Sequence, residues 1–134
     1  MSSSTMYRFS AGVLLVGGVL AILGQLLEIS ADPSAPQWIP ASWLALSGTL
    51  LVLLGLPELY FRQVNRAGRL GLVGFVLSFV AFLIVAGIQT VDAFVSPVLS
   101  ASAATRPFVD REAMPALLGF ELIGGLLLIV GPFV

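Results

Sequence analysis

The stretch Leu70–Val91, LGLVGFVLSFVAFLIVAGIQTV, contains no charged residue over its whole length. A helix that crosses the ~30 Å hydrocarbon layer of a bilayer needs about 20 predominantly apolar residues. In lipid, only helices and closed barrels satisfy the hydrogen-bonding groups of the backbone, and barrel strands are shorter and alternate in polarity. The stretch is therefore predicted to be a transmembrane helix.

Three further runs of the same kind lie before and after it. The first, Phe9–Leu27, is uncharged, the second begins after Pro40, and the last contains a single acid, Glu121. The predicted spans are about 9–30, 41–61, 70–95 and 115–134, and they form one transmembrane domain over 1–134. The sequence thus predicts an all-α integral membrane four-helix bundle.

Both ends of this arrangement leave an alternative open. Arg8 before the first run and Ser30-Ala31 after it are features of a signal peptide, but the run is longer than a typical signal-peptide core, so we expect it to be retained as a span. At the other end, Gly131-Pro132-Phe133-Val134 carries no polar tail. Either the terminal carboxylate lies at the interface, or the natural chain continues.

The composition fits lipid rather than water as the solvent. Of 134 residues, 58% are hydrophobic and 10% are charged, and the mean hydropathy is +1.07. The six basic residues are all Arg, the net charge is −1, and there is no Lys, His or Cys. This excludes an electrostatic footprint for nucleic acid, a disulfide, a thiolate zinc site and the commonest general base. We therefore expect no enzyme, no metal site and no cofactor.

The placement of Arg predicts the orientation. The connection 62–69 holds three Arg and no acid, and Arg8 lies on the same side, whereas the opposite loops hold only Arg106 and Arg111. The positive-inside rule then puts both termini in the cytoplasm. The predicted topology anchors are Arg62, Arg66 and Arg69 on the inner side, and Trp38 and Trp43 in an aromatic belt on the outer side. The three Arg are interpreted as anchors and not as a lipid-recognition cluster.

A shift of 64 positions aligns two parts of the sequence. It lays Gln25-Leu26-Leu27-Glu28 over Gln89-Thr90-Val91-Asp92, and Pro33 over Pro97. Two tandem helical hairpins would produce this pattern. Chance similarity between apolar segments with proline stops would produce it as well, so both interpretations stay open.

Among the polar side chains within or beside the predicted spans, three acids and two amides lie toward the outer ends. Ionisable residues in a membrane are energetically expensive, so each is a hypothesis for a functional site. A rise of 1.5 Å per residue places all three acids in the outer leaflet, and an i,i+3 spacing puts two amides on the same helix faces as two of the acids. The candidates for binding a ligand or ion are Gln25, Glu28, Gln89, Asp92 and Glu121.

These residues admit two interpretations. In the first, they line a polar pocket near the outer end of the bundle, which binds a cation, a proton or a basic small molecule. In the second, Glu28 and Asp92 are solvated at the interface, and Glu121 is neutral or paired with Arg106 or Arg111.

Small residues mark the expected helix contacts. Gly17-x-x-x-Ala21 and Gly74-x-x-x-Ser78 are pairs of small residues at a spacing that lets two backbones approach closely in lipid. Pro57 is expected to kink or end the second span.

Three segments carry a resemblance to known proteins: Leu26-Leu27-Glu28-Ile29, Gln37-Trp38-Ile39-Pro40-Ala41-Ser42-Trp43 and Gly71-Leu72-Val73-Gly74-Phe75. In these segments the chain resembles small uncharacterised bacterial polytopic membrane proteins of the domain-of-unknown-function type. The resemblance implies a multi-pass protein of the bacterial inner membrane. It implies no activity and carries over no functional residue.

The sequence favours a non-catalytic integral membrane subunit or scaffold. Its expected partners are the lipid bilayer and other membrane subunits or a second copy, and not nucleic acid. The short loops, the many small residues and the lack of catalytic side chains support this hypothesis. The alternative is a small transporter, channel or ligand-binding membrane protein that uses the outer-leaflet carboxylates.

Overall fold

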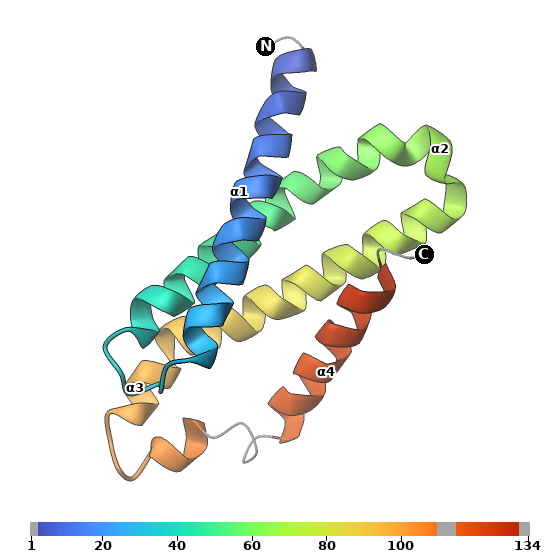
Figure 1. The fold of residues 1–134 in the computed structure, drawn as a ribbon. Helices are drawn as coiled ribbons and strands as arrows, with labels where there is room; N and C mark the ends of the chain where they lie inside the picture. Colours follow the sequence, from blue (N-terminus) through green and yellow to red (C-terminus); the bar gives the residue numbers. More distant parts are fainter. Residues whose placement is uncertain (1–2, 110–114, 132–134) are drawn as a thin grey trace.

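The computed structural model describes residues 3–109 and 115–131, and the regular structure in them is entirely helical. In chain order the elements are α1 (Ser3–Ile29), α2 (Trp38–Phe94), α3 (Ser96–Ser100), the 3-10 helix η1 (Arg106–Val109) and α4 (Pro115–Val130). Figure 1 shows their arrangement. The prediction of an all-α protein is confirmed.

The long element α2 consists of two helices joined by a sharp turn. Gly68 has φ 57° and ψ −150°, and it is the point at which the helical conformation is interrupted. Glycine adopts this left-handed region at little cost because it has no Cβ. We call Trp38–Arg66 the first arm and 68–94 the second arm. Figure 1 shows the two arms folding back along each other as a hairpin.

Among the described residues, three helical segments are long and apolar enough to cross a membrane: Arg8–Ile29 in α1, Trp38–Arg66, and Gly68–Ser100. Each of the first three predicted spans overlaps one of these segments, and the predicted span boundaries stay predictions. The first arm begins at Trp38 and continues to Arg66, beyond the predicted end near 61. Arg and Gln are good helix formers, so the connection stays helical until a glycine allows the turn. Pro57 lies inside this arm and does not end it.

The fourth predicted span is shorter in the described structure. α4 has 16 residues, which rise about 24 Å, against the ~30 Å of the hydrocarbon layer. The predicted end of this span, 132–134, lies outside the described residues.

α1 packs on the first arm through small residues. A Cβ added at Gly24 would overlap the backbone of Ala45, and one at Gly48 would overlap the backbone of Ala21. A Cβ at Gly17 would lie 2.9 Å from the Gly48 carbonyl oxygen. The Gly17-x-x-x-Ala21 pair is therefore a helix contact, as predicted. Such close approach gains van der Waals contact, which drives helix association in lipid.

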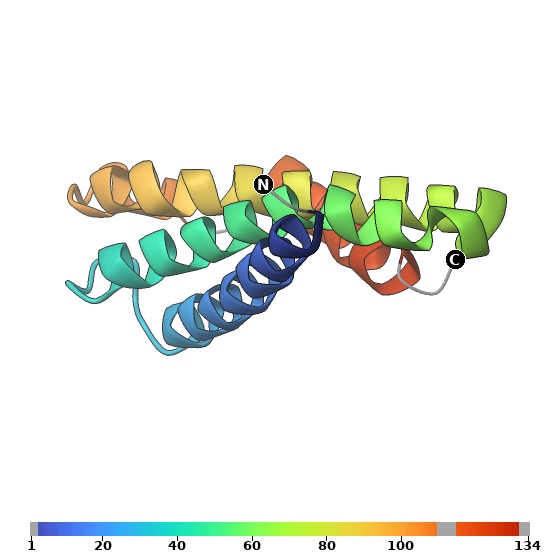
Figure 2. The same ribbon diagram turned by 90° about the horizontal axis from the view of Figure 1, so that it is seen from above.

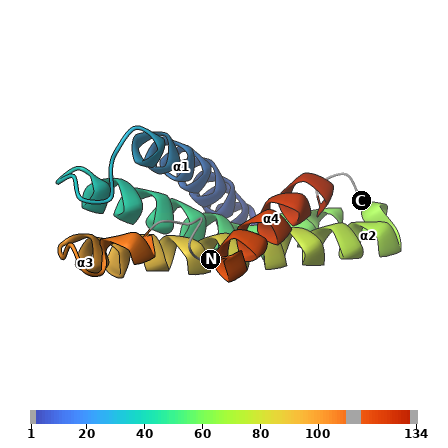
Figure 3. The same ribbon diagram turned by 90° about the horizontal axis from the view of Figure 1, so that it is seen from below.

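α4 packs on the second arm. A Cβ at Gly124 would lie 2.7 Å from the Ile84 Cγ2 atom, and a Cβ at Gly131 would meet Ser78. Between the described residues, α1 and α4 each contact α2 but not each other. Figures 2 and 3 show them lying against different parts of the hairpin. Two tandem helical hairpins would pair α1 with the first arm and α4 with the second arm, as observed. That the two hairpins arose from an internal repeat stays a prediction.

Large apolar side chains face outward over most of the molecule. Leu15 is 70% exposed and Ile29 is 83% exposed, whereas Ala45 and Ser42 are completely buried. A soluble protein has the reverse distribution and rarely exposes apolar patches of this extent. Helices in lipid contact one another through small residues and turn their large apolar side chains outward.

Candidate functional site

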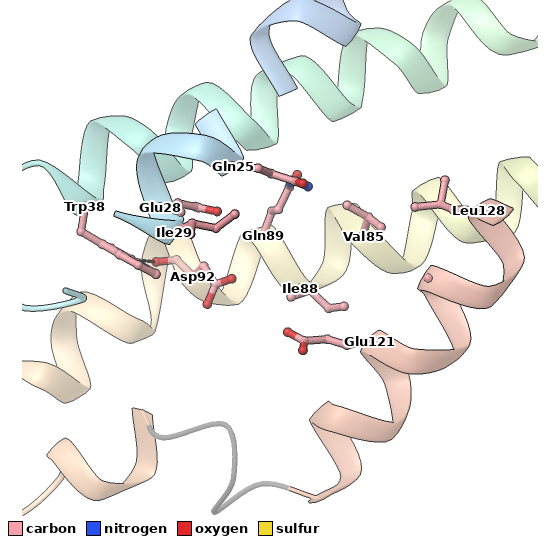
Figure 4. A pocket seen from close by; sticks show the side chains of 11 residues that line it. Gln25, Glu28, Ile29, Trp38, Val85, Ile88, Gln89, Asp92, Glu121 and Leu128 are labelled. Carbon is pink, nitrogen blue, oxygen red and sulfur yellow. Dashed lines mark hydrogen bonds between the residues drawn. The ribbon is translucent and has the colours of Figure 1, made fainter. Parts of the chain in front are cut away.

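A cavity of about 390 Å³, which we call the polar pocket, lies between α1, α2 and α4. Figure 4 shows it from close by. The lining consists of Gln25, Glu28, Ile29, Trp38, Val85, Ile88, Gln89, Asp92, Glu121, Gly125 and Leu128. All five polar residues singled out from the sequence belong to this lining. Their role in binding stays a prediction.

Each helix contributes its polar side chains from one face. Gln25 and Glu28 are three residues apart on α1, and Gln89 and Asp92 have the same spacing on the second arm, so the members of each pair lie side by side. Glu121 comes from α4. In Figure 4 all five side chains are directed into the space between the helices. The pocket thus lies on the hairpin of α2, in the space between α1 and α4.

Gln89 is the most deeply buried of the five, with 2% of its surface exposed. Among the residues that the structure describes, neither its amide nitrogen nor its amide oxygen has a hydrogen-bond partner. A buried polar group left unsatisfied costs about 1–3 kcal/mol. Because Gln89 lines the pocket, a polar group bound there would supply the missing partner.

Two hydrogen bonds hold Asp92 and its side chain in the lining of the pocket. Asp92 is 6% exposed, and the Ser96 hydroxyl donates to its Oδ1 atom at 3.3 Å. The Trp38 indole N–H donates to the Asp92 carbonyl oxygen at 3.0 Å. The Trp38 bond ties the start of the first arm to the end of the second arm, and the Ser96 bond orients the carboxyl group.

The ring of Trp38 is buried between the helices. Trp38 is 7% exposed and lines the polar pocket, and its predicted place at the level of an outer aromatic belt stays a prediction. The physical reason for the burial is its N–H group, which usually finds a hydrogen-bond partner when the ring is buried. Trp43 does keep an exposed surface (49%), and its ring meets Phe94 edge-on at a centroid distance of 4.9 Å.

The predicted basic anchors lie at the other end of the hairpin. They are Arg62, Arg66 and Arg69, all exposed and close in sequence to the turn at Gly68. The polar pocket is at the end where Trp38 and Asp92 meet. The acidic pocket and the basic turn therefore mark opposite ends of the molecule.

An ion pair joins the two loops next to the pocket. Arg106 Nη2 lies 3.7 Å from Asp32 Oδ1. The pKa of Asp32 is lowered, first because the hydroxyl and the backbone N–H of Ser34 both donate to its carboxylate, and further because of the Arg106 charge. Desolvation acts in the opposite direction but does not outweigh them. Asp32 is accordingly kept ionised.

This ion pair bears on one of the two interpretations of Glu121. Arg106 was one of the two residues expected to pair with Glu121, and the structure places its guanidinium beside Asp32 instead. The other, Arg111, lies outside the described residues.

The acids around the pocket do not form a compact ligand set. Within residues 3–109 and 115–131, no group of three or more His, Cys, Asp and Glu side chains is arranged to hold a metal ion. Hard metal ions need several oxygen ligands within about 2.0–2.6 Å of one point. The three acids instead surround a wider cavity.

Sequence reasoning missed the apolar half of the lining. Ile29, Val85, Ile88 and Leu128 belong to it, but each lies in a helix that is apolar on nearly all sides. The 3.6-residue periodicity that marks a buried face in a soluble helix is therefore weak here. Trp38 offered a detectable signal, because an indole N–H inside a membrane protein needs an acceptor.

Comparisons with protein-family models, with curated proteins and with solved structures found no match for the chain. The resemblance to bacterial polytopic membrane proteins therefore stays a prediction.

Proposed function

We propose that this chain is an integral membrane protein that binds a small organic cation in the polar pocket. The observation that carries the proposal is the convergence of three acidic and two amide side chains, from three helices, on one cavity. The helices that supply four of them are long and apolar enough to cross a membrane. Polar groups in such helices are expensive and mark substrate sites or ion pathways.

The charges around the pocket favour a positively charged ligand. Glu28, Asp92 and Glu121 bring three carboxyl groups, and the described residues of the lining include no Arg. Removing a carboxylate from water costs several kcal/mol unless an opposite charge or hydrogen bonds compensate. A bound cation supplies that charge. If it carries an N–H group, it can also donate to the amide oxygen of Gln89.

The size and the walls of the pocket favour an organic cation over a metal ion. A volume of about 390 Å³ falls within the range of small-molecule sites, about 300–1,000 Å³. Ile29, Val85 and Leu128 form an apolar wall, and the Trp38 indole is the aromatic side chain that attracts cations best. A monoamine or quaternary ammonium ion with a short apolar body matches both parts of the lining.

Titration calorimetry with alkylammonium ions, such as butylammonium and tetraethylammonium, tests this proposal on the purified protein in lipid nanodiscs. We expect the wild type to bind, and Glu121→Gln to bind at least about tenfold more weakly, because losing one charge of a desolvated pair costs about 2 kcal/mol or more. Glu58→Gln is the matched control, since Glu58 is an acid of the first arm outside the pocket lining. An absence of binding by the wild type, or equal losses in both variants, would contradict the proposal.

We also propose that the membrane is the bacterial inner membrane, with both termini in the cytoplasm and the pocket toward the outer leaflet. The three Arg at the turn, opposite the pocket, support this orientation through the positive-inside rule. A reporter phosphatase that is active only outside the cytoplasm distinguishes the two orientations. It should be active when inserted after Ala103 and inactive when inserted at Gly68, and the reverse pattern would overturn the proposal.

A second function, as a non-catalytic subunit or scaffold, is favoured by the exposure of α1. Only 11% of its apolar membrane-length window is buried, because its contact with the first arm runs along the narrow Gly17 and Gly24 face. The remaining surface is available to lipid or to another membrane helix. Native mass spectrometry of membrane extracts separates the two: a fixed stoichiometric assembly supports the subunit function, and a monomer carrying only lipid contradicts it.

A further inference from the structure

A second and larger cavity, of about 630 Å³, lies at the turn end of the hairpin; we call it the turn-end groove. Its lining consists of Leu56, Leu59, Tyr60, Gln63, Leu70, Gly71, Gly74, Phe75, Ser78, Phe82 and Gly131. It is therefore built mainly from the two arms, with the end of α4 at its border. None of these residues belongs to the polar pocket.

The turn-end groove crosses the boundary between headgroups and hydrocarbon. The first arm has 29 residues, which rise about 43 Å, more than the ~30 Å hydrocarbon layer. If Trp38 lies near the outer boundary, the inner boundary falls about 20 residues later, close to Glu58. Tyr60 and Gln63 then lie at headgroup level together with Phe75, which stacks on Tyr60, and the part of the groove lined by Ser78 and Phe82 lies in the hydrocarbon.

The groove extends from the headgroup level into the hydrocarbon. From Leu70 to Phe82 the second arm rises about 18 Å, and about 10 Å of this lies inward of Phe75, which is level with Tyr60. Phe75 forms the middle of the wall, where it stacks on Tyr60 at a centroid distance of 4.6 Å. The groove is thus polar at its headgroup end and apolar and aromatic below it, which is the polarity of a phospholipid.

The headgroup end of the groove is also positively charged. Arg62, Arg66 and Arg69 are all exposed there, against one acid, Glu58. Arg66 lies three residues after Gln63 and so continues the helix face on which Gln63 lines the groove. Basic sites between helices at the cytoplasmic side of membrane proteins attract anionic lipid headgroups.

We propose that the turn-end groove binds one anionic phospholipid, with its phosphate beside Arg66 and one acyl chain along Phe75 and Phe82. Both the charge at the headgroup end and the apolar part below it are needed for this ligand. The proposal adds a ligand to the anchoring role predicted for the three Arg.

Native mass spectrometry of the protein from nanodiscs with equal amounts of phosphatidylglycerol and phosphatidylcholine tests the proposal. We expect one phosphatidylglycerol to be retained in preference to phosphatidylcholine. The double variant Arg66→Gln/Arg69→Gln should reduce this preference by about fivefold or more. Arg8→Gln, which removes a basic residue of α1, should leave it unchanged. Equal retention of the two lipids by the wild type, or an unchanged preference in the double variant, would overturn the proposal.

A variant of the apolar part completes the test. Gly71→Leu places a side chain in the groove and should abolish retention of the lipid, whereas continued retention would show that the lipid binds outside the groove. Soluble glycerol phosphate should not displace the lipid, because it lacks the acyl chain; displacement would show a phosphate site and contradict the proposal. These variants leave the polar pocket unchanged, so the two proposals can fail separately.

Discussion

The substitution Gly24→Ala tests whether direct backbone contact holds α1 to the hairpin. An added Cβ would overlap the backbone nitrogen of Ala45 and would lie 2.6 Å from its Cα and 2.7 Å from its Cβ. Two of these atoms are backbone atoms, which cannot move aside by changing a rotamer. α1 would therefore have to shift away from the first arm.

Two effects of opposite sign determine how much Gly24→Ala changes the free energy of unfolding. Alanine is favoured over glycine inside a helix by about 0.5–1 kcal/mol. Overpacking of a close contact costs about 1–3 kcal/mol, and a shift of α1 also weakens the neighbouring contacts of Gly17 and Gly48. We expect the free energy of unfolding to fall by about 1–2 kcal/mol, because the steric cost exceeds the gain in helix propensity.

Unfolding in mixed micelles, followed by circular dichroism, measures this difference. Gly18→Ala is the matched control, because a Cβ at Gly18 meets no atom within 4 Å. It should be neutral or stabilising by about 0.5–1 kcal/mol. If Gly24→Ala proved as stable as Gly18→Ala, the close approach of the two backbones would be refuted.

Three further predictions concern the pocket end of the molecule. Gln89→Leu removes a buried amide that lacks partners among the described residues, so the free energy of unfolding should rise by about 1–3 kcal/mol while alkylammonium binding weakens; a loss of stability in denaturation would contradict this. Trp38→Phe removes the hydrogen bond to the Asp92 carbonyl oxygen and should lower the free energy of unfolding by about 1 kcal/mol; in the same denaturation assay, an unchanged value would show that this bond contributes nothing. The folded state depresses the pKa of Asp32 below its ordinary value of 3.8, so its stabilisation is present above that value and is lost as pH falls through the depressed pKa. At acidic pH, the free energy of unfolding of Asp32→Asn should depend less on pH than that of the wild type. An unchanged pH dependence would contradict the stabilising role of the Asp32 carboxylate.

Much of the fold could be predicted because lipid imposes simple rules. Uninterrupted apolar runs of membrane length have to be helices, so the segments around Leu15, Thr49 and Ile84 were placed in helices from composition alone. The convergence of the polar side chains on one level could be predicted from residue spacing and from the helical rise. Gln89 and Asp92 share a helix face by their spacing, and the rise per residue put them at the same level as the acids of the other helices.

The remaining features depend on tertiary contacts that leave little trace in an apolar sequence. Gly68 is one of 14 glycines, and only the backbone conformation distinguishes the turn from the helical residues around it. The burial of Trp38 depends on the Asp92 carbonyl oxygen, 54 positions away in the chain. The gap between α1 and α4 arises because each helix packs on a different arm, and no periodicity indicates this.

The reactivity of a cysteine at position 121 tests most directly whether Glu121 faces a cation-accepting pocket rather than lipid. The chain has no cysteine of its own, so Glu121→Cys and Ile123→Cys can be compared in bilayers without background; Ile123, two residues further along α4, is 54% exposed on the apolar surface. We predict that a water-soluble cationic thiol reagent modifies Glu121→Cys, that alkylammonium ions slow this reaction, and that Ile123→Cys stays unmodified. Equal or reversed reactivity of the two variants would contradict the existence of a polar pocket within the membrane.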